Sequence, residues 1–224
     1  LICLTRIYYS LCNKRLNTSD YHLIATRWAQ SFFNLIPGWK LIINGKYNIP
    51  KNKKNYIIVA NHESAVDILA IYFLNIQFRW LAKKESFNIP FIGHTMMHSG
   101  YIPIERGSKE SHQKALKACK DKLKANMSIL FFPEGTRSTA GSPKAFKVGA
   151  FKLAQECNLP ILPIVLKGSG LLLKKGSLAP NKEYVQLSIL PLVTHKNNEN
   201  IEDYTERVRE LIVNKHAKMP AVKP

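Results

Sequence analysis

The clearest sign of the fold is the stretch Tyr56-Ile57-Ile58-Val59-Ala60-Asn61-His62-Glu63-Ser64-Ala65-Val66-Asp67, which a second apolar run, residues 68–74, follows. Its first five residues are apolar and rich in β-branched side chains, which favours a strand, whereas the second run suits a buried helix. His62 then lies at the carboxyl end of a strand. Open α/β sheets bind their ligands at such ends.

His62 and Asp67 are five residues apart, so a continuous helix would point them to different faces. They converge if the chain turns between them, with Ser64 as the helix N-cap and Ala65 as the first helical residue. Asp67 then accepts the Nδ1 proton of His62 and leaves Nε2 free as a base, which makes a catalytic dyad without an attached nucleophile. The alternative is structural, because Ser64-x-x-Asp67 also resembles a capping box around a hydrogen-bonded loop histidine.

From residue 39 onward, strand patterns alternate with helix patterns, which predicts an α/β fold with a mainly parallel mixed sheet of about seven strands flanked by helices. Pro103 and Pro163 fall inside strand candidates and predict edge strands or bulges. The strand candidates are residues 40–43, 56–60, 78–82, 101–104, 129–132, 161–166 and 184–190, and the main helix candidates are 65–74, 108–125, 146–157 and 201–216.

Residues 1–38 form a separate unit in this interpretation, before an α/β domain over 39–224. They combine aromatic and basic residues with few acidic ones, and a break at residues 18–20 predicts two helices, the second capped by Ser19 or Asp20 and ending before Pro37. This composition is typical of an interfacial membrane hairpin, although a helical pair packed on the sheet explains it equally well. No run reaches the roughly 18 apolar residues of a spanning helix. Residues 1–4 are either the end of a membrane segment or signal anchor, or the start of an amphipathic helix.

The net charge of +18 implies an acidic partner, which is a nucleic acid, an anionic bilayer or a phosphorylated substrate. Nucleic-acid binding is the remote alternative, because no recognised motif for it occurs and the aromatic residues lie in apolar periodic runs. The four cysteines, Cys3, Cys12, Cys119 and Cys157, show neither paired nor metal-binding spacing. We therefore expect a reducing compartment, no disulfide framework and no metal site.

Two further strand candidates run into charged turns, one at Glu105-Arg106 and one at Glu134-Gly135-Thr136-Arg137-Ser138. In a parallel sheet these turns open on the same crevice as His62. Two guanidinium groups suit a phosphate, and Gly135 permits a tight turn whose N–H groups add donors. A histidine base beside a phosphate clamp, with no serine or cysteine nucleophile, predicts that the substrate is a phosphorylated alcohol.

Four motifs in order resemble those of the glycerolipid acyltransferase family, and specifically of its 1-acyl-glycerol-3-phosphate (lysophosphatidic acid) acyltransferases. They are Asn61-His62-x4-Asp67, Gly100-Tyr101-Ile102-Pro103-Ile104-Glu105-Arg106, Phe132-Pro133-Glu134-Gly135-Thr136-Arg137-Ser138 and Leu159-Pro160-Ile161-Leu162-Pro163-Ile164-Val165. The resemblance covers roughly residues 40–190 and includes Ala82-Lys83-Lys84-Glu85 and Phe146-Lys147-x-Gly149-Ala150. Each motif alone is weak, whereas four in order are specific.

The resemblance implies transfer of an acyl group from acyl-CoA or acyl carrier protein to the sn-2 hydroxyl of lysophosphatidic acid, giving phosphatidic acid in phospholipid biosynthesis. It implies no cofactor beyond the acyl donor, and no metal. It makes His62 the base and Asp67 its partner. Another lysophospholipid or glycerol-3-phosphate is the alternative acceptor.

The same resemblance implies membrane association, at the cytoplasmic face of the cell membrane, with an anionic membrane surface as a partner. It assigns substrate binding to a set of residues around the crevice: Lys84, Arg106, Glu134, Gly135, Thr136 and Arg137.

Overall fold

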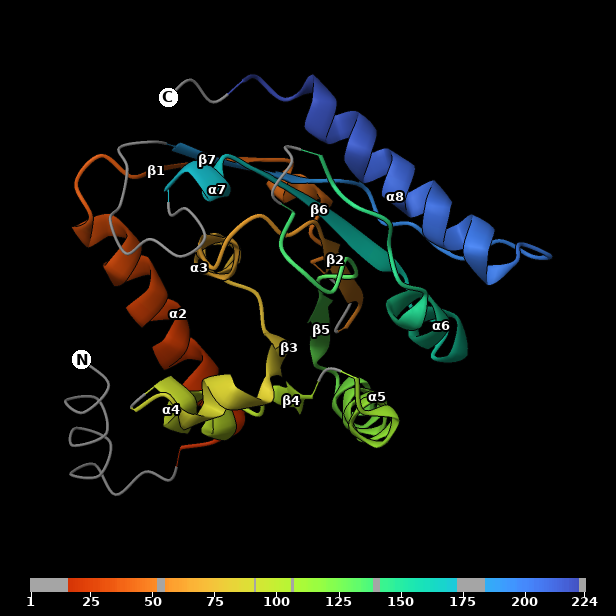
Figure 1. Ribbon diagram of the computed structural model, residues 1–224, viewed down its shortest axis with the longest axis horizontal. Helices are drawn as coiled ribbons and strands as arrows, with labels where there is room; N and C mark the ends of the chain where they lie inside the picture. Colours follow the sequence, from red (N-terminus) through yellow and green to blue (C-terminus); the bar gives the residue numbers. More distant parts are fainter. Residues whose placement is uncertain are drawn as a thin grey trace.

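The computed structural model describes residues 16–51, 55–90, 92–105, 107–138, 142–172 and 184–221. A seven-stranded sheet forms the middle of the molecule, with helices on both of its faces (Figure 1). The resulting three-layer α/β arrangement confirms the predicted fold class.

All seven predicted strands are present, within one or two residues of the expected ends. They are β1 (Lys40–Asn44), β2 (Ile57–Ala60), β3 (Phe78–Lys83), β4 (Ile102–Ile104), β5 (Ser128–Phe131), β6 (Ile161–Lys167) and β7 (Tyr184–Ile189). Their order across the sheet is β1-β7-β6-β2-β5-β3-β4.

The strand directions bring the predicted site residues to one edge of the sheet. Strands β2 to β6 all run the same way, while β7 is antiparallel to β6 and pairs in parallel with β1. The turns after β2, β3, β4, β5 and β6 therefore share one edge, which we call the carboxyl edge. The turns at Glu105 and at Glu134 therefore lie at the same edge of the sheet as His62, as expected.

The helices of the described residues include all four predicted in the α/β region, and also short elements that the sequence did not reveal. The helices are α2 (Thr18–Leu35), α3 (Val66–Tyr72), α4 (Ile92–His98), α5 (Lys109–Lys124), α6 (Gly149–Glu156), α7 (Ser169–Leu172) and α8 (Ile201–Lys218), with 3₁₀ turns η1 (Lys46–Asn48) and η2 (Lys84–Asn88). η2 and α4 have too few residues for a helical period to show against the prolines and glycines around them.

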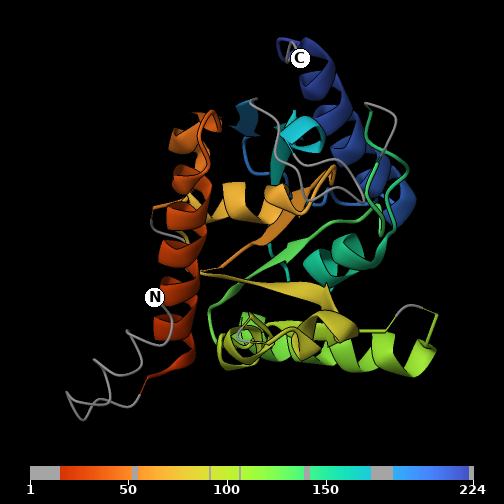
Figure 2. The ribbon, with the colours of Figure 1, turned by 60° about the vertical axis from the view of Figure 1, so that its left-hand side comes forward.

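Strand β2 lies at the centre of the hydrophobic core, and all four of its residues are fully buried. Ile58 and Ala60 contact the layer that contains α2 and α3, whereas Ile57 and Val59 contact the layer of α5, α6 and α8. Figure 2 shows these two layers on either side of the sheet. Because β2 is buried on both faces, its continuous apolar run is what a parallel central strand requires.

Helix α2 belongs to the same core as the sheet, since Ala29 and Phe33 are buried against it. Its N-cap is Asn17 rather than the predicted Ser19 or Asp20. Asn17 forms a capping box with Asp20, which lies inside the helix, so the acidic residue supports the cap from position N3. Residues 1–15, the first part of the predicted membrane hairpin, lie outside the described residues. Within the described ranges, no helix has both the length and the apolar character to cross a bilayer.

The two strand prolines are accommodated differently. Pro103 lies in β4, which is an edge strand as predicted, but Pro163 lies in β6, between β7 and β2. The pairing of β6 slips by one residue beside Pro163, because Ile164 faces Ile189 whereas Ile161 faces Val193. This bulge in the neighbouring chain removes the need for the N–H that proline lacks.

Candidate active site

The histidine that follows β2 and the aspartate in the first turn of α3 are in direct contact. Nδ1 of His62 lies 2.7 Å from Oδ2 of Asp67. The Asp67 side chain is fully buried, and that of His62 is 17% exposed. Because a carboxylate only accepts hydrogen bonds, this contact places the imidazole hydrogen on Nδ1 and leaves a lone pair on Nε2.

The carboxylate of Asp67 also organises the turn that precedes it. Its Oδ2 atom accepts the backbone N–H groups of Glu63, at 2.7 Å, and Ser64, at 2.9 Å. The prediction that Ser64 is the N-cap is wrong: the N-cap is Ala65, which provides no side-chain bond, and α3 begins at Val66. Oγ of Ser64 is only a long acceptor for the N–H of Val66, at 3.4 Å, whereas Oδ2 of Asp67 fixes both the turn and the imidazole.

The turn after β5 holds the backbone of His62 from the opposite side. Oε1 of Glu134 accepts the His62 N–H at 2.8 Å, and Oε2 accepts the Lys144 N–H at 2.9 Å. The carbonyl oxygen of His62 accepts the N–H of Ser138 at 2.7 Å. Burial raises the pKa of Glu134, while the two backbone donors oppose this shift. Glu134 thus connects two loops; its predicted contact with substrate stays a prediction.

Two neighbours restrict the His62 ring and the strand that carries it. The ring of Phe132 stacks on the imidazole, with centroids 4.1 Å apart and planes at 23°. Asn61 is fully buried and uses its side chain as an extra strand position, since Oδ1 accepts the N–H of Leu166 and Nδ2 donates to its carbonyl, both at 2.8 Å. The histidine therefore extends from a rigid strand end.

The residues predicted to bind phosphate lie around the same edge, except that Arg106 falls outside the described residues. Lys84 begins η2 directly after β3, and its Nζ lies 3.2 Å from Oε2 of Glu105, with both side chains more than half exposed. Such an exposed pair is weak and leaves the lysine free to meet an anion. Arg137 is half-buried.

Two lysines that the sequence reasoning did not assign lie against the turn 134–137. Gly135 has a φ of +69°, and a Cβ atom there would lie 3.1 Å from Nζ of Lys147. Nζ of Lys144 donates to the carbonyl of Arg137 at 2.9 Å. Lys147 belongs to the Phe-Lys-x-Gly motif, but nothing in the order of residues showed that the chain folds back over this turn. The turn thus carries more positive charge than its own sequence contains.

Neither the two described thiols, Cys119 and Cys157, nor a cluster of metal ligands adds to this site. Burial raises the pKa of the Cys119 thiol to about 12, and burial also raises that of Cys157. Both thiols are therefore protonated at neutral pH and poorly nucleophilic. In the described part of the chain, no three His, Cys, Asp or Glu side chains gather as metal ligands would.

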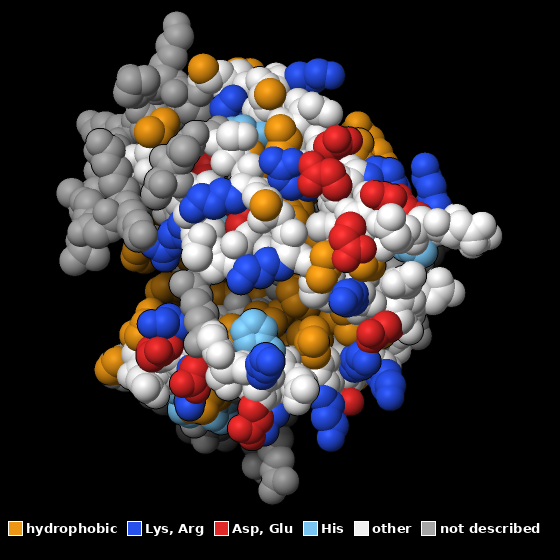
Figure 3. All heavy atoms as spheres, turned by 45° about the vertical axis from the view of Figure 1, so that its right-hand side comes forward, with side chains coloured by type: hydrophobic (Ala, Val, Ile, Leu, Met, Phe, Trp, Pro, Cys, Tyr) orange, Lys and Arg blue, Asp and Glu red, His pale blue; other side chains and the backbone are white. Residues whose placement is uncertain are grey.

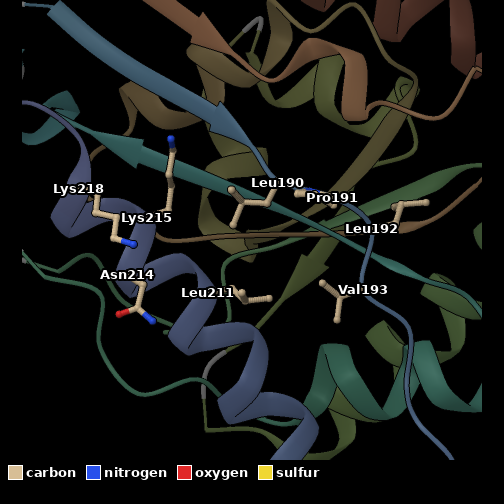
Figure 4. A pocket seen from close by; sticks show the side chains of 8 residues that line it. All are labelled: Leu190, Pro191, Leu192, Val193, Leu211, Asn214, Lys215 and Lys218. Carbon is tan, nitrogen blue, oxygen red and sulfur yellow. The ribbon is translucent and has the colours of Figure 1, made fainter.

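The described surface has two hollows. Figure 3 shows hydrophobic side chains inside a hollow on the side that carries α5, α6 and α8, with Lys and Arg side chains around it. A separate pocket of about 350 Å³ lies between residues 190–193 and the end of α8, away from His62 (Figure 4). It follows the bulge opposite Pro163, so it is explained by the sheet rather than by the chemistry of the dyad.

Comparisons with known proteins agree with the four motifs. A model of the Acyltransferase family matches residues 40–167. A 1-acyl-sn-glycerol-3-phosphate acyltransferase of Chlamydomonas reinhardtii is 32% identical over 85% of this chain and 57% of its own length. One of Borreliella burgdorferi is 34% identical over 80% of this chain and 73% of its own length.

The fold is also found in a solved structure. The crystal structure of the 1-acyl-sn-glycerophosphate (LPA) acyltransferase PlsC from Thermotoga maritima superimposes with a TM-score of 0.79 and 26% identity, covering 90% of this chain and 80% of that one. The chain spans about half the length of several curated relatives, including 44% of a chloroplastic relative from Arabidopsis thaliana. On the family match, the identities and the shared fold, this chain belongs to the acyltransferase family.

Proposed function

We propose that this protein transfers an acyl group from a thioester donor, acyl-CoA or acyl carrier protein, to the sn-2 hydroxyl of 1-acyl-sn-glycerol-3-phosphate, giving phosphatidic acid. The observation that carries the proposal is the 2.7 Å contact between His62 and Asp67 at the carboxyl edge, beside a turn rich in positive charge. The names of the relatives support the choice of acceptor.

The His62 imidazole is the general base in this mechanism. Nδ1–H is held by Asp67, so Nε2 accepts the proton of the acceptor hydroxyl while its oxygen attacks the thioester carbonyl. The tetrahedral intermediate then expels the thiolate, which takes the proton from the imidazolium. Asp67 stabilises that imidazolium and keeps the ring in the required tautomer.

The acceptor phosphate binds to the cations around the turn after β5. Arg137 and Lys147 lie at this turn, and within the described residues neither is paired with a carboxylate. Lys84, directly after the neighbouring strand β3, joins this set, and we assign Arg106 to it from its place in the sequence alone. A phosphate held here places the glycerol backbone beside His62, which turns a bimolecular proton transfer into a local one.

The lipid acceptor requires contact with a membrane, and the described surface offers a candidate face. Among the described residues, most of the large exposed hydrophobic side chains occur on α2, on α4 and directly after η2, namely Leu23, Phe32, Leu35, Ile89, Ile92 and Met97. Helix α2 contacts α4, so these elements are continuous. Together with the net charge of +18, they suit binding to an anionic bilayer.

One assay tests the activity directly. Purified protein is given radiolabelled acyl-CoA or acyl carrier protein with a panel of acceptors: lysophosphatidic acid, glycerol-3-phosphate and lysophospholipids with a headgroup. We expect the highest kcat/KM for lysophosphatidic acid, with phosphatidic acid as the product. Preference for glycerol-3-phosphate or for a headgroup-bearing acceptor would contradict the proposed substrate.

A further inference from the structure

Glu63 follows His62 in the chain, and its side chain points toward the turn after β6, on the side of the dyad opposite Glu134. The side chain of Glu63 is 12% exposed, and its Oε2 atom accepts three hydrogen bonds from the turn after β6. The donors are the N–H groups of Gly168 at 3.0 Å and Gly170 at 3.3 Å, and the hydroxyl of Ser169 at 3.3 Å. Glu63 therefore joins the His62 turn to the end of β6.

The second oxygen of the same carboxylate reaches the last turn of α8. Oε1 of Glu63 lies 3.1 Å from Nε2 of His216, whose side chain is 7% exposed. Lys167 fixes this end of the helix, because its Nζ donates to the carbonyls of His216 at 3.0 Å and Met219 at 2.8 Å. The backbone around His216 is thus held by Lys167 independently of the contact with Glu63.

These contacts complete a symmetrical support for the dyad. Glu134 and Ser138 hold His62 from the β5 side, whereas Glu63 holds the same turn from the β6 side. The backbone N–H of Glu63 also donates to Oδ2 of Asp67 at 2.7 Å. A shift of Glu63 would therefore be transmitted directly to the carboxylate that orients the imidazole.

We propose that Glu63 is a positioning residue for the acyl transfer, acting on His62 and Asp67 through this turn, with His216 as its partner in α8. The inference rests on the proposed role of His62 as base. A displacement of about 1 Å in a catalytic group lowers turnover by roughly 100-fold. Loss of Glu63 leaves the turn held from one side and lowers kcat without removing any group that touches substrate.

The test compares Glu63→Ala with Glu63→Gln in the full chain. Glutamine can still accept from the turn after β6 and donate to Nε2 of His216, so it restores most of the rate. For Glu63→Ala we expect kcat to fall roughly 10- to 100-fold, with a smaller change in the KM of either substrate. His216→Ala has a smaller effect, since three bonds to Oε2 remain.

A proton NMR signal separates positioning from general loss of structure. The Nδ1 proton of His62, bonded to a buried carboxylate, resonates at low field and is identified by its absence in His62→Ala. The spectrum is recorded without substrate, so this test of positioning is valid even if the protein does not catalyse the proposed reaction. We expect this signal to weaken or shift in Glu63→Ala and to persist in Glu63→Gln.

Glu199→Ala is the matched control, because Glu199 accepts two bonds from Arg207 at the other end of α8. It lowers stability but keeps both the signal and kcat. The proposal is overturned if Glu63→Ala keeps the wild-type signal and kcat, or if Glu199→Ala loses them to the same extent.

Discussion

At the scale of single residues, the spacing of His62 and Asp67 predicted the contact between their side chains correctly. Five residues cannot bring two side chains together on one continuous helix, so the spacing required a turn, and the contact at 2.7 Å shows that turn. The predicted cap was wrong because the carboxylate that receives the imidazole also accepts the N–H groups of Glu63 and Ser64, so Asp67 organises the turn from inside the helix and α3 begins one residue later than expected.

His62→Ala should lower turnover by about 10²- to 10⁴-fold, the contribution of a positioned base. The ring is partly exposed and most of the turn is held through the backbone, so the melting temperature should change little. Asp67→Asn should be severely impaired, because an amide nitrogen facing Nδ1 forces the hydrogen onto Nε2. Steady-state kinetics and thermal unfolding measure both effects. Near-wild-type turnover in folded His62→Ala would contradict the mechanism.

Arg137→Lys keeps the charge but loses the planar fork that grips a phosphate. We expect acceptor kcat/KM to fall by roughly 1 to 3 kcal/mol in transition-state free energy, with the donor KM little changed. The exposed Arg27 on α2 provides the control, as Arg27→Lys should leave both parameters unaltered. A rise in the donor KM instead would assign Arg137 to the phosphates of coenzyme A.

At the scale of secondary structure, the positions of the strands could be predicted from the sequence, but the contacts between elements distant in the sequence could not. Short apolar runs located all seven strands: six of them contain buried residues, and even the edge strand β1 has one half-buried face. The closing of the 142–147 segment over the turn after β5 was not predictable, since no periodic pattern records which loop covers which. The same applies to Pro163: composition shows a proline in a strand, but the bulge that accommodates it lies in another part of the chain.

Helix α2 is joined to the sheet by a buried histidine whose charge state matters. His22 lies 3.0 Å from the Tyr101 hydroxyl and 3.0 Å from the Ile76 carbonyl oxygen, and burial, with Arg79 nearby, lowers its pKa to about 3. In the unfolded chain its pKa is 6.5. Below pH 6.5 the unfolded chain binds a proton that the folded chain does not, so the stability is fully present above 6.5 and is lost as the pH falls toward 3.

Thermal or urea unfolding at pH 7 and pH 5 checks this, with His22→Gln as the comparison. Wild-type protein should lose about 2 kcal/mol more stability between these pH values than the variant does. Equal losses in the two proteins would show that His22 is not the group responsible.

At the scale of the whole molecule, the exposed apolar side chains of α2 predict how the protein meets a bilayer. Phe32→Glu combined with Leu35→Glu should weaken sedimentation with anionic vesicles and lower activity on membrane-embedded acceptor more than on a short-chain soluble one. Tyr47→Glu, on an exposed residue of η1, is the control. If vesicle binding is unchanged in the double variant, the lysines of the α/β domain are responsible for attachment.

The pairing of β1 with β7 has a consequence for how the protein is made. The ribosome releases residues 40–44 about 140 residues before their partners at 184–188. At about 5–20 residues per second, the nascent chain waits on the order of ten seconds with this strand unpaired. Chaperones that bind extended apolar segments have that interval in which to act. A message cut short before the codon for Tyr184 therefore yields a polypeptide whose sheet ends at β6, with an open hydrogen-bonding edge that invites aggregation.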